Sequence, residues 1–410
     1  MKNVKIILGV AIIAALMTMT FASCGDPEPT DDVWTVTFNP GAGAEPVASQ
    51  SVNDQGLAEK PYAFKAWTPQ AAGFYSASQV ATWKNGTKVW DFEKDKVTAD
   101  ITLTAEWANP QAISLTGLTP TSGKDLEKVV KYTNDQGDKF IWAINGNQES
   151  PAVVLDKAYA DLRIVGIGGE QKIQLTGKGN LFTVGAASTT TTIALTVGSN
   201  VNLAGVTNNN KALVFVREGA TFNLTGGKIT GNTSDGTGYV SDSNNAGFGA
   251  AAVHVDAATF NFTSGEISGN TNAYATSGSK SAGAVYIEAK GSANLTGGEF
   301  KTNANNSGAG SENVYFTYSS AVKLGGALAA GEIGFGAVTD NTFGKITVDP
   351  SFTGTATINL AGAAGNWTNK TILIGATTGQ QAKLTLGKYF PSKATIALKW
   401  DSGTPGKLVL

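Results

Sequence analysis

The sequence predicts an all-β protein in which a small module is followed by a long body of stacked repeats. Glycine accounts for 50 of the 410 residues, and threonine and asparagine are also abundant, a composition typical of short strands joined by turns. Apolar patterns of helix length are rare, and similar segments recur from about residue 200. Because the only cysteine is Cys24, disulfide bonds cannot stabilise this fold.

The first 23 residues predict export. Lys2 and Lys5 precede an apolar run at residues 6–17, which is too short to cross a bilayer core of about 30 Å. Small residues then lead to Cys24, an arrangement that resembles the lipobox of bacterial lipoproteins, with Phe21 at the position that usually holds leucine. The resemblance implies that the leader is cleaved and that lipid is attached to Cys24, which anchors the chain to a membrane.

Residues 24–32 are acidic, contain two prolines and lack large apolar side chains, so they predict a solvated tether. An acidic stretch directly after the lipidated cysteine is similar to the surface-export signal of some Gram-negative lipoproteins. We therefore expect a cell-envelope protein that is anchored in the outer membrane and faces the exterior. A nucleic-acid partner is not expected, because the net charge is −2 and only Arg163 and Arg217 are arginine.

Residues 33–108 form the predicted small module. It opens with an alternating strand at 33–38 and closes with another at 101–107. These strands, with Lys60-Pro61 and Trp90-Asp91-Phe92 between them, resemble the B-repeat of internalins, also called the Listeria-Bacteroides repeat. The family's usual Gly-Trp pair appears here as Ala66-Trp67. The resemblance implies a β-grasp-like fold and the role of a spacer or adhesive unit.

Four aromatic residues of this module, Trp67, Trp90, Phe92 and Trp107, allow two interpretations. They could form a face on which sugar rings stack, or they could fill the core of a domain that has little else to bury. We favour the core, because aromatic side chains dominate apolar burial in small domains. The module contains neither His nor Cys, so no nucleophile-base pair is expected in it.

Residues 110–410 predict a β-solenoid. Four segments align as an alternating strand followed by a tight turn: Val201–Gly205, Phe222–Gly227, Phe260–Gly265 and Ala293–Gly298. Their asparagines are 21, 38 and 33 residues apart, and the shortest spacing suits one rung of two or three short strands. The longer spacings place insertions at Thr233–Gly249 and Thr271–Ala282, which we expect to leave the same edge and stack on each other.

This body resembles the right-handed parallel β-helix of pectate-lyase-like proteins, and more closely the GGxISGN repeats of bacterial adhesin-like proteins. The right-handed coil is implied by the resemblance and not by the spacing. Residues 125–131 predict a short helix, capped by Ser122, that covers the open end of the first rung. Toward the C-terminus the strands become less regular.

Enzymes of this fold are mostly polysaccharide lyases and hydrolases that use clustered carboxylates. Candidate calcium ligands occupy nearly equivalent turns at Glu218, Asp256 and Glu288. A second column on successive rungs contains Lys228, Glu266 and Glu299. Each rung contributes a single residue and neither column offers a close Asp-Asp pair, so we expect no catalytic residues and no cofactor. A polysaccharide-degrading enzyme is the alternative function.

His254, the only histidine, lies between two valines that point to the opposite face, so we expect it at the surface. Arg217 directly follows a strand and is also expected at the surface. The aligned Asn232, Asn270 and Asn303 could bind a ligand. We favour a structural ladder, in which each asparagine hydrogen-bonds the turns above and below it.

The two insertions are the best binding candidates, through Tyr239, Asp242, Phe248 and Tyr274. Long loops on a rigid scaffold often carry binding residues, and aromatic side chains in such loops have no core to fill. We therefore predict a non-enzymatic surface protein that contacts a host or environmental glycan or protein at this edge. The alternative is that the insertions are tolerated without a function.

Overall fold

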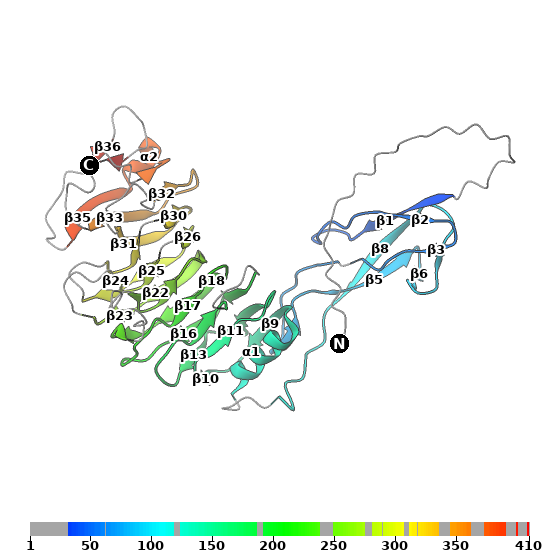
Figure 1. Ribbon diagram of the computed structural model, residues 1–410, viewed down its shortest axis with the longest axis horizontal. Coiled ribbons are helices and arrows are strands. Elements are labelled where there is room, and N and C mark those ends of the chain that lie inside the picture. Colours follow the sequence, from blue (N-terminus) through cyan, green and yellow to red (C-terminus); the bar gives the residue numbers. More distant parts are fainter. Residues whose placement is uncertain are drawn as a thin grey trace. The chain divides into compact units, whose positions relative to one another are not determined.

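The computed structural model shows an all-β chain (Figure 1). It describes residues 32–61, 63–118, 124–186, 192–237, 249–274, 281–288, 290–306, 311–317, 319–335, 345–361, 373–390, 399–400 and 408–409. The leader, Cys24 and nearly all of the acidic tether lie outside these ranges. Within them, no helix combines the length and apolar character needed to span a membrane.

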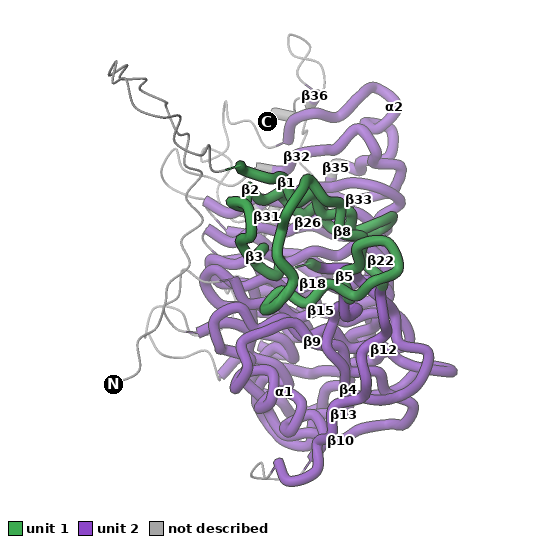
Figure 2. Tube along the Cα trace, turned by 90° about the vertical axis from the view of Figure 1, so that its right-hand side faces the viewer, with its two compact units in different colours: residues 1–63, 82–106 green, residues 64–81, 107–410 purple. Residues whose placement is uncertain are grey.

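The chain divides into two compact units (Figure 2). Unit 1 takes in the described residues of Met1–Ala63 and Thr82–Glu106, and unit 2 consists of Phe64–Ala81 and Trp107–Leu410. Residues 33–108 therefore do not form one continuous unit. Strand β4 (Gly73–Ser76) belongs to unit 2 because it pairs antiparallel with β9 (Lys139–Ile144).

Unit 1 is built on a five-stranded sheet in the order β2-β1-β8-β5-β6. Its strands are β1 (Val33–Asn39), β2 (Gln50–Asn53), β5 (Val80–Asn85), β6 (Lys88–Val89) and β8 (Ile101–Ala108). The central pair, β1 and β8, is parallel, and β1 also pairs antiparallel with β2. Two short strands, β3 (Gly56–Leu57) and β7 (Lys96–Val97), form a separate antiparallel pair. The alternating side chains of Val36, Phe38 and Leu103 fill the core.

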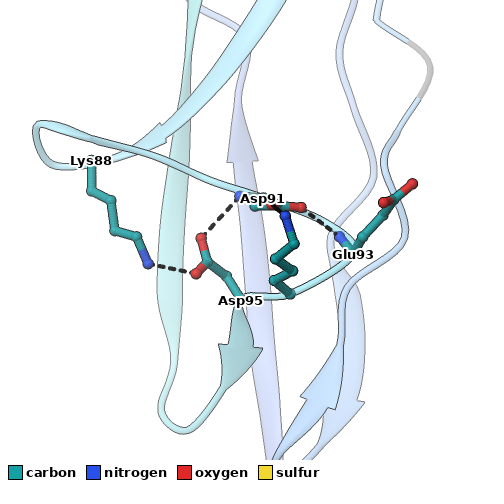
Figure 3. Close-up of polar contacts among 5 residues, drawn as sticks. Lys88, Asp91, Glu93 and Asp95 are labelled. Atoms are coloured by element: carbon teal, nitrogen blue, oxygen red, sulfur yellow. Dashed lines mark hydrogen bonds and ion pairs between the residues drawn. The ribbon is translucent and has the colours of Figure 1, made fainter.

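The Trp90-Asp91-Phe92 segment forms a turn that hydrogen bonds hold in place (Figure 3). The Glu93 N–H donates to the Asp91 carboxylate, and the Asp91 N–H donates to Asp95, whose other oxygen pairs with Lys88. These backbone bonds, followed by the lysine contacts, lower the pKa of both aspartates. Asp91 thus stabilises the turn.

The four aromatic residues considered for sugar stacking are divided between the units. Trp90 is buried in unit 1, where Phe92 is half-buried. Trp67 belongs to unit 2 and packs edge-on against Tyr75, with ring centroids 5.3 Å apart. Trp107, also in unit 2, is half-buried.

Unit 2 contains three parallel ladders, because each repeat contributes three strands that pair with the same three strands of the next repeat. The first ladder includes β11 (Val153–Leu155), β14 (Phe182–Val184), β17 (Val214–Val216), β21 (Val253–Val255), β25 (Val285–Ile287) and β29 (Val314–Phe316). Figure 1 labels β11, β17 and β25 of this ladder.

The second ladder includes β9, β12 (Asp161–Gly166), β15 (Ala194–Gly198), the first halves of β18 (Thr221–Thr230) and β22 (Thr259–Ser268), β26 (Ser292–Leu295), β30 (Ala321–Leu324), β32 (Lys345–Val348) and β34 (Leu373–Ile374). The third includes β10 (Gln148–Ser150), β13 (Gln171–Leu175), β16 (Val201–Ala204), the second halves of β18 and β22, and β27 (Glu299–Lys301).

Toward the C-terminus, β31 (Ala329–Phe335), β33 (Thr355–Ala361) and β35 (Leu384–Phe390) continue both the first and the third ladder. The parallel pattern ends at β36 (Lys399–Trp400) and β37 (Leu408–Val409), which pair antiparallel. A short helix, α2 (Thr378–Gln381), lies between β34 and β35.

Inward-facing aliphatic and aromatic side chains fill the space between the ladders, and neighbouring repeats place like residues against each other. Phe222 and Phe260, for example, stack with centroids 5.5 Å apart. Helix α1 (Asp125–Gln136) packs Leu126, Val129 and Val130 onto the same core. The helix occurs where the sequence predicts it but continues five residues further, and Lys124 is its N-cap; Ser122 lies outside the described residues.

The repeat spacing needs one correction. Val201–Ala204 pairs with the second half of β18 and therefore belongs to the third ladder, not to that of Phe222. The true counterpart of Asn223 is Thr196, and these residues are 27 positions apart. Both strands alternate in the same way, so the local pattern could not separate them. The two insertions are consequently shorter than a 21-residue repeat implies.

Candidate functional site

Three segments of unit 2, which we call arms, connect the third-ladder strand of one repeat to the first-ladder strand of the next. The outgoing ends pair in parallel through β19 (Thr233–Ser234), β23 (Thr271–Asn272) and β28 (Ala304–Asn305). The returning ends pair through β20 (Gly249–Ala250) and β24 (Ser281–Ala282), and Ala282 bridges to Ser311. The described ends of the two predicted insertions therefore leave one edge and stack, as expected.

The repeat spacing does not predict the third arm, which runs from Ala304 to Ser311. The available signal was Asn303, which is aligned with Asn232 and Asn270. Asn232 and Asn270 each follow a glycine, but Asn303 does not. The third arm is also short, so its signal in the sequence is weak.

The bases of the arms are packed parts of the fold. Ser234 and Ser281 are fully buried. The Asn272 amide donates to the Gly249 carbonyl at 3.2 Å, and the Ser281 hydroxyl donates to the Asn305 side chain at 3.0 Å. Because both bonds join the base of one arm to that of its neighbour, the positions from which the arms extend are fixed.

Of the predicted binding residues, Tyr239, Asp242 and Phe248 lie outside the described residues, as does the predicted lipidation site Cys24. Tyr274 directly follows the base of the second arm and is half-buried. Its backbone N–H donates to the Asn272 side chain at 3.0 Å. Asn272 thus connects Tyr274 to the returning end of the first arm.

The outer face of the first ladder carries an aromatic column. The central residues of successive strands are Phe215, His254, Tyr286 and Tyr315. The His254 ring lies between the rings of Phe215 and Tyr286, at centroid distances of 5.1 and 5.0 Å. Tyr286 and Tyr315 stack at 6.0 Å.

The expected surface position of His254 is wrong, because the side chain is only 4 % exposed. Alternation does direct it away from the two flanking valines, which face the core. The outer face is nevertheless covered. Ala250 and Ala282, from the returning ends of the arms, pack in one cluster with Tyr286 and Tyr315.

A charged turn follows the aromatic column. Arg217, Asp256 and Glu288 occupy equivalent positions, since the backbone N–H of each donates to the strand of the preceding repeat. Glu218 is one position further along and exposed, so it is offset from the other two acidic residues. The Nε2 of His254 lies 3.0 Å from a carboxylate oxygen of Glu288. Arg217 is half-exposed, and its guanidinium lies 5.4 Å from the centre of the Phe215 ring.

The two neighbouring carboxyl groups have pKa values shifted in opposite directions. Burial, reinforced by the negative charge of Glu288, raises the pKa of Asp256 above its usual range. The hydrogen bond from His254 lowers the pKa of Glu288. The turn therefore combines a carboxyl group that resists ionisation with one that is stabilised as an anion.

No three His, Cys, Asp or Glu side chains in the described ranges are close enough together to hold a metal ion. The candidate calcium ligands Glu218, Asp256 and Glu288 thus do not converge on one cation-sized space. The second column, Lys228, Glu266 and Glu299, is in register as expected. Its charges form ion pairs, including a contact of 2.6 Å between Lys228 and Glu170.

The asparagine ladder is confirmed. Asn232, Asn270 and Asn303 are almost completely buried, and each links its repeat to the next. The ladder continues to Asn209 on one side and Asn313 on the other. A second, half-exposed ladder connects Asn223, Asn261 and Asn294 at 2.7 to 2.8 Å. The buried asparagines bond with protein groups and so serve the fold.

No family model matches this chain, and no match was found among the curated proteins or the solved structures.

Proposed function

We propose that this chain is a lipid-anchored bacterial surface protein that binds a glycan or a protein through its arms. In this proposal, unit 1 is a B-repeat, the three ladders wind as a right-handed β-helix, and lipid on Cys24 attaches the chain to the outer membrane facing the exterior. No catalytic step and no cofactor are required.

The observation that carries the proposal is the in-register pairing of the arm bases. Packed bases hold the described ends of three consecutive arms at one edge. The first two arms contain Tyr239, Phe248 and Tyr274, and aromatic side chains on loops are favoured in binding surfaces. The partner is expected to offer apolar ring faces together with hydroxyl or amide groups.

Binding can be tested on an array of purified glycans and on immobilised mucin. A variant that combines Tyr239→Ala, Phe248→Ala and Tyr274→Ala should lose at least tenfold in affinity for any probe that the unaltered chain binds, because several aromatic contacts are removed together. Tyr159→Ala is the matched control, since Tyr159 is 66 % exposed and lies outside the arms. Equal binding by the triple variant would contradict the proposal.

Anchoring can be tested separately in growing cells. Incorporation of an alkyne-labelled fatty acid should occur in the unaltered chain and disappear in Cys24→Ala, which should also leave the membrane fraction. If label and membrane association persist in Cys24→Ala, the lipid is not on Cys24.

A polysaccharide-degrading enzyme is the second candidate, and the charged turn is the observation that favours it. Opposite pKa shifts on neighbouring carboxyl groups are the arrangement used by acid-base pairs, with Asp256 as the proton donor and Glu288 as the ionised partner. Reducing-end and unsaturated-product assays on the arrayed polysaccharides distinguish the two functions. New chain ends that disappear in both Asp256→Asn and Glu288→Gln would favour the enzyme, and binding without turnover would favour the adhesin.

A further inference from the structure

The first and last strands of unit 1 are neighbours. In the parallel pair β1–β8, Val36 lies opposite Ile101 and Asn39 opposite Thr104. A side-chain bond extends this pairing, because the Thr35 N–H donates to the Asp100 carboxylate at 2.7 Å. The described chain enters unit 1 at β1, and β8 leads out of it into unit 2.

Tension between the N-terminal tether and unit 2 therefore pulls β1 and β8 in opposite directions along their length. Bonds between parallel strands loaded in this way share the load and must break together. The strands of an antiparallel hairpin loaded at its open end separate one pair at a time. Since forced unfolding is governed by the barrier to unfolding, the parallel arrangement prolongs the life of the folded unit.

The segment Phe64–Ala81 gives unit 1 a second attachment. It leaves unit 1, pairs with β9 through β4 and returns at Thr82. Phe74 anchors the segment, because its side chain is 2 % exposed and packs against Tyr132 and Phe140 in unit 2. The remaining strands β5, β6, β7 and β8 are thus connected to unit 2 at both ends.

We propose that unit 1 is a load-bearing clamp between the tether and unit 2, and that it yields first by releasing residues 33–63 alone. Once β1 slides from β8 and the short β3–β7 pair opens, this stretch extends until the load reaches β4. About 30 residues extend to roughly 100 Å, whereas release of residues 33–108 as one body would give roughly 250 Å. The clamp rests on the proposed function only for the source of the load, a lipid anchor at one end and a bound partner at the other.

The test is single-molecule stretching at constant force on the full chain without its leader. Cys24, the sole cysteine, supplies one handle and a C-terminal tag the other. The first extension should be close to roughly 100 Å, the length of residues 33–63. Further unfolding steps should follow later. A first extension of the longer length would overturn the proposal.

Two variants test whether the β1–β8 pairing sets the lifetime of that first event. Asp100→Ala removes the acceptor of the Thr35 N–H and should shorten the lifetime roughly fivefold, whereas Asp100→Asn keeps an acceptor and should stay near the unaltered value. Equal lifetimes for all three chains would count against load sharing by this pair.

Handle position supplies the directional control. Handles at Cys24 and at Asn53→Cys load the open end of the antiparallel β1–β2 pair, where Val33 faces Asn53. With these handles, the β1–β2 pair should separate sooner at the same force than unit 1 does under end-to-end load. Asp100→Ala should leave the lifetime of the β1–β2 pair unchanged. A lifetime as long as under end-to-end load would overturn the clamp. Failure of the Cys24 labelling experiment would remove the natural load but alter none of these lifetimes, so the two proposals fail separately.

Discussion

Asn270 joins three consecutive repeats through one buried side chain. It accepts from the Asn232 N–H at 3.1 Å and donates to the Ile229 carbonyl at 3.0 Å and to Asn303 at 3.1 Å. Asn270→Ala should therefore destabilise unit 2 by about 3 kcal/mol, because several buried polar groups lose their partners. The free energy of unfolding in urea measures this.

Asn261→Ala is the matched control, since Asn261 belongs to the same repeat but to the half-exposed ladder. Water can replace its partners, so the loss should be about 1 kcal/mol or less. Equal losses at the two positions would show that burial does not set the strength of these ladders.

The charged turn predicts opposite effects of neutralising two adjacent acidic residues. The raised pKa of Asp256 means that its ionisation opposes folding, so stability is lost as the pH rises through that pKa. The lowered pKa of Glu288 means that its ionised form favours folding, and that contribution is lost as the pH falls through that pKa. Asp256→Asn should raise the midpoint of thermal unfolding at pH 7, and Glu288→Gln should lower it.

The changes that Asp256→Asn and Glu288→Gln cause in the midpoint of thermal unfolding should both shrink as the pH approaches the ordinary carboxylate range of about 4. Thermal unfolding across pH 3 to 8 checks this. A destabilising Asp256→Asn at pH 7 would mean that Asp256 makes a favourable ionic contact. His254→Gln would then be the next variant to compare with Glu288→Gln.

The sequence allowed the asparagine ladder to be predicted, because identical polar residues at equivalent positions of a repeat have one another as neighbours. The burial of His254 could not be predicted in the same way. Alternation tells to which side of a strand a residue points. It does not tell that the returning ends of the arms place Ala250 and Ala282 against the outer face of this ladder, at Tyr286 and Tyr315. The same limit applies to the offset of Glu218, which depends on turn lengths.

At the scale of elements, each arm has a packed base and an outer part. Removing residues 238–248 and 275–280 while keeping both bases should change the stability of unit 2 by less than about 1 kcal/mol, because loop length affects closure entropy only weakly. Extending the first deletion to take in Ser234 and Ala250, both buried, should cost several times more. Thermal unfolding of both deletion variants measures the difference, and equal costs would mean that the bases contribute little.

The place of the first two arms could be predicted from Gly231-Asn232 and Gly269-Asn270, since the Gly-Asn pair marks the exit of each arm. Their lengths could not, because Val201–Ala204 imitates a strand of another ladder. The Phe64–Ala81 segment shows a similar limit. Strand β4 has an ordinary local pattern, and only its pairing with β9 assigns it to unit 2.

At the scale of the whole molecule, the exchange of Phe64–Ala81 predicts which unit responds to a core substitution. Phe74→Ala should lower the stability of unit 2 by about 3 kcal/mol and leave unit 1 nearly unchanged, although Phe74 lies between two segments of unit 1 in the sequence. Leu103→Ala should do the opposite, because Leu103 is fully buried in unit 1. Calorimetry should resolve two transitions, each shifted by one variant only; a shift of both by Phe74→Ala would mean that the units unfold together.

Neighbouring repeats offer nearly identical faces to each other. Thr221, Phe222 and Asn223 lie opposite Thr259, Phe260 and Asn261, which in turn face Ser292, Ala293 and Asn294. An extra copy of such a repeat, gained by recombination within the gene, would find suitable partners on both sides and need no new interface. Each copy would add about 4.8 Å between the N-terminal end of unit 2 and the elements that follow the copy. Lineages could therefore inherit bodies of different length without altering the residues that hold one repeat to the next.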